Sequence, residues 1–343
     1  MQAGIGYLLC GVTALAIGIG VGCGQIDSAT TSHIDLTMEG WKLSPEAAAG
    51  LEARLEMEPQ DIASRIKLLG YYSKKRYEDS TARERHANHM LWLIEHQPEE
   101  EVLGSAGEMD PGSVPEAYVQ AKALWRQHLE GTHKENPQVL RNAAGFFMIW
   151  DHELSESYLK QGLTLQPENP EWYEELARLY GFDALDLDGK VDVEAAKKSF
   201  EMFEAAFERT PERSRQYLRE DAAKAALFAG HLDKAREYAK DMLAANTNKN
   251  DWNYGNAIHH ANLVLGHIAL QEGKPELAEE YLLKAGDTPG SPQLDSFGPN
   301  MLLARKLLEQ GRKEAVIEYL RRCGKFWDEE QAAKWIRVVE SGD

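Results

Sequence analysis

The chain has 343 residues, 43% of them hydrophobic, so it is long and apolar enough to bury a core, and disorder is not the default. Its 56 acidic residues outnumber 38 basic ones and give a formal net charge of -18. This acidity argues against general nucleic-acid binding, which needs positive charge to displace counterions, and is compatible with basic or neutral partners.

The N-terminal residues 4–22 contain no charged side chain and are long enough for a membrane span or the core of an export signal. The stretch ends in Gly20-Val21-Gly22-Cys23, which resembles a bacterial lipoprotein cleavage site. The resemblance implies that Cys23 becomes the lipidated first residue. Gly20 departs from the leucine-like residue of that pattern, so an uncleaved anchor, an ordinary signal peptide and a soluble chain stay open.

We therefore expect residues 1–23 to be a signal peptide or membrane anchor and residues 24–44 to be a flexible, polar tether. The location implied is the bacterial cell envelope, with the bulk of the chain outside the cytoplasm. Beyond Cys10 and Cys23, the chain has only Cys323, which falls on an apolar helical face and should be a buried thiol. The cysteines predict no disulfide framework and no metal site, and no cofactor is expected.

Helical patterns begin at Ser44, which can cap a helix, with Pro45 in the first turn. Apolar spacing then predicts helices within residues 51–58, 62–72 and 86–97. Residues 99–115 are rich in Gly, Pro, Asp and Glu, and predict an exposed loop or a boundary between two halves of the chain.

Further helices are predicted over residues 116–130, as a pair within 137–167, and over 173–180. The insertion that follows is acidic and is similar to a calcium loop in its residues Asp183, Asp186, Asp188, Gly189 and Asp192. Ala184 stands where the first ligand would be and no glutamate closes the loop, so a solvated insertion is favoured over an ion site. The partner helix ends before Pro211.

Three more helix pairs are predicted over residues 217–245, 259–292 and 295–326, turning at Gly230, Gly273 and Gly311, with a capping helix over 329–339. In the middle pair, small residues fall where two antiparallel helices would cross closely. These residues are Gly266, Ala269, Ala278 and Ala285.

The order Leu265-Gly266, Ala269, Gly273, Ala278, Leu282, Ala285 resembles the tetratricopeptide repeat, a helix–turn–helix unit of about 34 residues. The resemblance implies an all-α, right-handed solenoid over residues 45–343, because such repeats bury their apolar faces only against neighbours. It also implies a non-catalytic scaffold that binds a protein or peptide partner.

In that family the first helix of each pair lines an inner groove. Projecting this face onto the chain selects candidate partner-binding residues: Glu171, Glu174, Arg178, Glu220, Lys224, His260, His267 and Arg305. The alternative is that these side chains are merely solvated. His260 and His267 are two helical turns apart, too far for the usual zinc pair, so no metal is predicted.

Two rival functions remain. One is an all-helical envelope hydrolase acting on glycans with paired carboxylates, which would need a deep pocket where acidic residues converge. The other is a self-assembling structural protein. The chain has no phosphate-binding Gly-x-x-x-x-Gly-Lys, no Gly-x-Ser-x-Gly and no His-Glu-x-x-His sequence, so we predict that it is not an enzyme.

Overall fold

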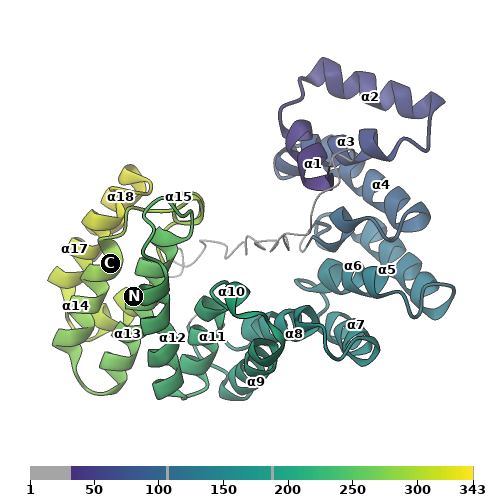
Figure 1. The fold of residues 1–343 in the computed structure, drawn as a ribbon. Helices are drawn as coiled ribbons and strands as arrows, with labels where there is room; N and C mark the ends of the chain where they lie inside the picture. Colours follow the sequence, from purple (N-terminus) through teal and green to yellow (C-terminus); the bar gives the residue numbers. More distant parts are fainter. Residues whose placement is uncertain (1–31, 106–107, 187–188, 343) are drawn as a thin grey trace. The chain divides into compact units, whose positions relative to one another are not determined.

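The computed structural model describes residues 32–105, 108–186 and 189–342, and within them the regular secondary structure is helical (Figure 1). The one extended pairing there is an isolated bridge between Leu185 and Val191. The predicted all-α class is confirmed. The proposed anchor, including Cys23, lies outside the described residues, and no described helix is both long and apolar enough to cross a membrane.

The chain divides into two compact units, separated in sequence between Trp172 and Tyr173. The first unit contains α1 (His33–Trp41), α2 (Pro45–Met57), α3 (Ile62–Lys75), α4 (Ser80–His96), the short η2 (Glu101–Gly104), α5 (Pro115–Glu130), α6 (Pro137–Phe147) and α7 (His152–Leu165). Helix α8 (Pro170–Asp183) begins in the first unit and continues into the second.

The second unit continues with α9 (Val193–Arg209), α10 (Glu212–Arg215), α11 (Arg219–Phe228), α12 (Leu232–Ala245), α13 (Tyr254–Gln271), α14 (Pro275–Gly286), α15 (Pro292–Phe297), α16 (Leu302–Glu309), α17 (Lys313–Cys323) and α18 (Glu329–Ser341). The predicted pairs within 217–245 and 259–292 are α11–α12 and α13–α14. The first helix of the last predicted pair is broken into α15 and α16, because Gly298 between them adopts a left-handed conformation with φ of 79°.

The expectation of a flexible tether is wrong for residues 33–41, which form α1. Ser32 caps this helix by accepting a hydrogen bond from the Asp35 N–H. Helix α1 packs along α3 at a crossing that two glycines make possible. A Cβ atom on Gly40 would lie 2.1 Å from the Lys67 carbonyl oxygen, and one on Gly70 would lie 2.2 Å from the Thr37 carbonyl oxygen.

Residues 99–115 are neither a fully exposed loop nor the boundary between the units. Leu103 and Met109 are buried, and Glu108 pairs with Arg76 and lies 3.1 Å from Nε2 of His86. Burial would raise the pKa of Glu108, but the hydrogen bond from His86 and the charge of Arg76 outweigh it and lower the pKa to about 2. The ionised carboxylate of Glu108 thus anchors this segment to the first unit through Arg76 and His86.

The same helix-ending turn recurs three times in the second unit, at the predicted positions Gly230, Gly273 and Gly311. Each glycine has a positive φ, between 72° and 83°. After α13, the Gly273 N–H donates to the Leu270 carbonyl and the Lys274 N–H donates to the Ala269 carbonyl, which is a Schellman motif. Equivalent bonds close the turns at the other two glycines, so the three connections are the same structure.

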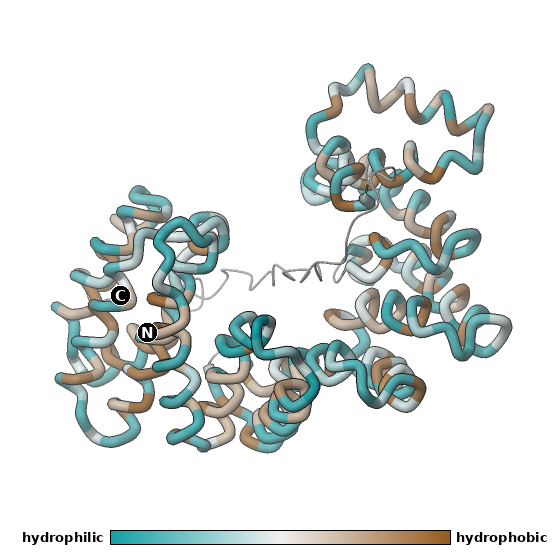
Figure 2. The backbone as a smooth tube through the Cα atoms, in the orientation of Figure 1, coloured by the Kyte–Doolittle hydropathy of each residue, from teal (hydrophilic) through white to brown (hydrophobic). Residues whose placement is uncertain are grey.

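The core of the second unit is formed by buried side chains of neighbouring helices. Hydrophobic and hydrophilic segments alternate along these helices (Figure 2). Gly266 lies at the predicted close crossing, since a Cβ there would be 2.3 Å from Leu303 and 3.4 Å from the Ala278 carbonyl oxygen. Cys323 is fully buried as predicted, and burial raises the pKa of its thiol to about 12.

Candidate functional site

Five of the eight residues projected onto the first helices lie in one chain of contacts, together with one residue that the projection missed, Asp221. We call this set the first-helix surface: Glu174 and Arg178 on α8, Glu220, Asp221 and Lys224 on α11, and His260 on α13.

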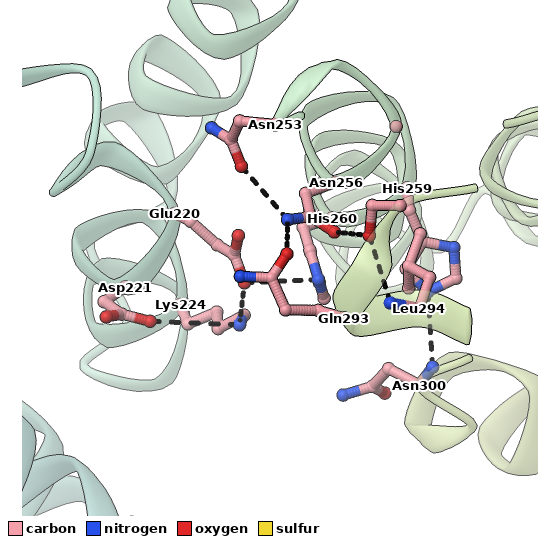
Figure 3. Close-up of polar contacts among 12 residues, drawn as sticks. Glu220, Asp221, Lys224, Asn253, Asn256, His259, His260, Gln293, Leu294 and Asn300 are labelled. Carbon is pink, nitrogen blue, oxygen red and sulfur yellow. Dashed lines mark hydrogen bonds and ion pairs between the residues drawn. The ribbon is translucent and has the colours of Figure 1, made fainter. Parts of the chain in front are cut away.

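The contacts run from α8 to α13 without a break. Nε of Arg178 lies 3.5 Å from Oδ2 of Asp221, and its Nη2 lies 3.8 Å from Oε2 of Glu174. Nζ of Lys224 lies 2.6 Å from Oε1 of Glu220 and 3.9 Å from Oδ1 of Asp221. Nε2 of His260 lies 3.2 Å from that same Glu220 oxygen (Figure 3).

These side chains are half-buried. Their exposed fractions run from 16% for His260 to 36% for Asp221. They are therefore held in place by their neighbours and remain partly accessible to solvent. Ion pairs at this depth add little to stability, so their main effect is to fix the direction of each charged group.

The local electrostatics favour charged Lys224 beside neutral His260. Burial would lower the pKa of Lys224, but Glu220 and Asp221 outweigh this and raise it. Burial lowers the pKa of His260 well below its usual value, and the charge of Lys224 lowers it further. With the imidazole neutral, its Nε2–H donates to Glu220. The surface then carries three carboxylates and two cations, a net charge of -1.

A layer of polar side chains holds α13 against the segment around α15 (Figure 3). Asn256 donates to Oδ1 of Asn253 at 3.1 Å and to Oε1 of Gln293 at 2.5 Å. His259, next to His260, donates from Nδ1 to the Ala285 carbonyl at 3.0 Å and accepts the Asn300 N–H at Nε2 at 3.2 Å. Sequence reasoning missed this layer, although the three-residue spacing of polar residues 253, 256 and 259 was its signal.

The other three projected residues do not join the surface. Glu171 pairs with Arg141 of α6. Arg305 lies 3.7 Å from Glu309 and next to Gly189 of the acidic insertion. His267 is only 6% exposed, which argues against the predicted contact with a partner. Burial, and then the charge of Lys306, lower its pKa to about 3.

The acidic insertion uses two of its carboxylates to shape the backbone. Asp186 accepts the Lys190 N–H at 2.8 Å, and Asp192 caps α9 by accepting the Glu194 and Ala195 N–H groups at 2.9 and 3.1 Å. Asp188 lies outside the described residues. Among those described, no group of three or more His, Cys, Asp or Glu side chains is placed to hold a metal ion.

Comparison with known proteins adds no relative. No protein-family model matches the chain, and no curated protein matches it either. The resemblance to tetratricopeptide repeats therefore depends on the sequence motif of residues 265–285.

Proposed function

We propose that this protein is a non-catalytic scaffold whose helix pairs stack as a right-handed, tetratricopeptide-like solenoid and hold a peptide or protein partner along the first-helix surface. One observation carries the proposal. Residues chosen only because they occupy matching positions in successive first helices meet in a continuous row of contacts across α8, α11 and α13.

The repeated turns support the same reading. Helices α11, α13 and α16 each end in a left-handed glycine with the same pair of backbone hydrogen bonds. Equivalent turns give successive pairs a similar geometry, which is the condition for a repeat array whose neighbours share a core.

The row of charges fits a partner that makes both polar and ionic contacts. An acidic side chain of the partner would pair with Arg178 or Lys224, and a basic one would pair with Asp221. Because the internal ion pairs are half-exposed, exchanging one of them for a partner's group costs little.

The test removes the two cations of the surface. In the full chain with Arg178→Ala and Lys224→Ala, capture of a native partner by a photo-crosslinker placed at the exposed position 217 should fall about tenfold, because charge-assisted hydrogen bonds to the partner are lost. The matched control is Lys197→Ala with Arg321→Ala, two exposed cations of the same unit that lie outside the surface. Equal capture by both double variants would refute the proposal.

We further propose that the N-terminus tethers this scaffold to a bacterial membrane, through a lipid on Cys23 or through the uncharged stretch 4–22. Feeding labelled palmitate to a bacterial host that expresses the chain distinguishes a lipid on Cys23 from a membrane span over residues 4–22. Cys23→Ser should abolish incorporation if the lipid is the tether, and Cys10→Ser should not change it. An unlabelled wild-type chain that still sediments with membranes would support the span, whereas an unlabelled chain in the soluble fraction would contradict both.

An all-helical hydrolase is the second candidate, because Glu52 and Glu56 both line a pocket of about 400 Å³ between α2 and α4. A general acid at such a site needs a raised pKa. The pKa of Glu52 is lowered instead, chiefly by its hydrogen bond with His89. The scaffold is therefore preferred, and glycan hydrolysis lost in Glu52→Gln would reverse this preference.

A further inference from the structure

The same pocket of the first unit holds an arrangement of cations that the scaffold function does not use. It is open to solvent and has a volume of about 400 Å³. Its polar lining comes from three helices: Glu52 and Glu56 of α2, Arg65 of α3, and Arg85, Asn88 and His89 of α4.

Arg65 is a fixed and buried cation at this pocket. Its side chain is 8% exposed, and its guanidinium carbon lies 3.8 Å from the centre of the Trp92 ring. Nε and Nη2 donate to the Pro59 carbonyl at 3.2 and 2.9 Å. With the described residues it forms no ion pair within 4.0 Å. A planar guanidinium held in this way is preorganised to donate to an oxyanion.

A hydrogen-bond network connects Arg65 to the second cation of the pocket. Nη1 of Arg65 lies 3.4 Å from Nδ1 of His89, and Nε2 of His89 lies 3.3 Å from Oε1 of Glu52. The Tyr72 hydroxyl donates to this same oxygen at 2.8 Å, and Arg85 donates to the Tyr72 hydroxyl at 3.0 Å. All the contacts to Glu52 thus meet at one carboxylate oxygen.

The network has two guanidinium groups and one carboxylate, and Glu56 brings the charges of the whole pocket lining into balance. Arg85 lies 3.6 Å from Glu52 and its side chain is 49% exposed, which leaves its remaining N–H groups accessible. Glu56, on the pocket wall, is exposed. The charges of Glu52 and Asp61 act on Arg65 from beyond 4.0 Å, so this buried arginine has no directly paired carboxylate among the described residues, and an incoming anion would supply one.

We propose that this pocket binds a carboxylate group, with Arg65 and Arg85 donating hydrogen bonds to its oxygens and Asn88 contacting it at the rim. Arginine is the side chain best suited to this task, because its fork of N–H groups matches the planar carboxylate. The carboxylate belongs either to a small free acid or to an acidic side chain of another polypeptide. The site lies in the first unit and does not depend on the first-helix surface.

Nuclear magnetic resonance of the arginine Nε–H groups in the full chain tests this directly. The probes are acetate, succinate and a triglutamate peptide with both ends blocked, each compared with chloride at equal ionic strength. Saturable shifts of the Arg65 and Arg85 signals are expected, and Arg65→Lys and Arg85→Gln assign them. Arg85→Gln should weaken binding about tenfold, since a charge-assisted hydrogen bond is lost.

Arg54→Gln is the matched control, because Arg54 is an exposed arginine of α2 that pairs with Glu58 and Asp61 outside the pocket. It should leave binding unchanged. Binding of the free acids alone identifies a small carboxylate, and binding of the blocked peptide identifies an acidic side chain. Shifts that do not saturate, equal shifts with chloride, or equal weakening by Arg54→Gln would overturn the proposal. If Arg65→Lys unfolds the protein, Arg85→Gln still tests the site. Arg85 is half-exposed, so we expect this variant to fold.

Discussion

His259, His260 and His267 lie within three turns of α13, and the surroundings of each favour the neutral imidazole. His259 is fully buried and both of its ring nitrogens are hydrogen-bonded to backbone groups. Burial, and then His260, lower its pKa to about 3. Burial likewise dominates the lowered pKa values of His260 and His267. Acid should therefore destabilise the second unit through this helix.

The contribution of His267 can be isolated. Its folded pKa of about 3 lies below the usual 6.5, so the unfolded chain takes up the proton first, and stability falls as the pH drops from 6.5 towards 3. The stability of the wild type relative to His267→Gln should fall by about 1.4 kcal/mol per pH unit in this window and stay constant above it. Urea unfolding at several pH values measures this, and a difference that does not change with pH would contradict the assignment.

At this scale, the sequence predicts which positions recur on successive helices better than it predicts which of them are exposed. Matching positions in the proposed repeat selected five residues that the structure brings into one row of contacts: Glu174, Arg178, Glu220, Lys224 and His260. The same matching selected His267, but two turns of spacing place it on the face of His260 and do not reveal that residues 261–269 are all buried. The pocket around Arg65 combines three helices and a carbonyl, and no local pattern marks it.

Among the elements, helices ending in glycine were the most predictable. A left-handed residue is required at those turns, and glycine adopts that conformation without strain. Helix α1 was missed because its stability depends on Gly40 meeting Gly70 of α3, a contact between distant residues. The polar composition of residues 99–115 likewise concealed Leu103 and Met109, whose burial is decided by tertiary packing.

Two glycines of the first unit should respond in opposite ways to the same substitution. Gly70→Ala should lower the free energy of unfolding by about 1–3 kcal/mol, because the added methyl would press on the Thr37 backbone of α1. Gly50→Ala, in α2 with nothing within 4 Å of its Cβ position, should raise it by about 0.5–1 kcal/mol. Chemical denaturation of the full chain measures both. Effects of the same sign would show that the α1–α3 crossing tolerates a side chain.

For the whole molecule, the separate cores imply that stability is local. Leu68 belongs to a cluster with Ala48, Leu55, Tyr72 and Ala82 in the first unit. Leu307 belongs to a cluster around Leu282 and Tyr319 in the second. If the helix pairs stack as proposed above, each element depends mainly on its neighbours, so damage to one cluster should leave the other intact.

Leu68→Ala and Leu307→Ala each truncate a fully buried side chain and should each cost about 2–5 kcal/mol. Amide hydrogen exchange should lose protection in α1–α4 for the first variant and in α14–α17 for the second, so each serves as the control for the other. Uniform loss of protection along the described chain in either variant would indicate a single cooperative unit and refute this prediction.

The enclosure of Cys323 has a practical consequence. Maleimide reagents attack thiolates, and a sulfur with no exposed surface and a pKa of about 12 will not react with them in the folded protein. With Cys10 and Cys23 replaced by serine, a dye will therefore react only with one introduced cysteine. Cys323 need not be mutated, so no cavity is made in the core. Tyr217 is 50% exposed and lies in the turn three residues before Glu220, so a fluorophore at that position would report optically on binding of the proposed partner.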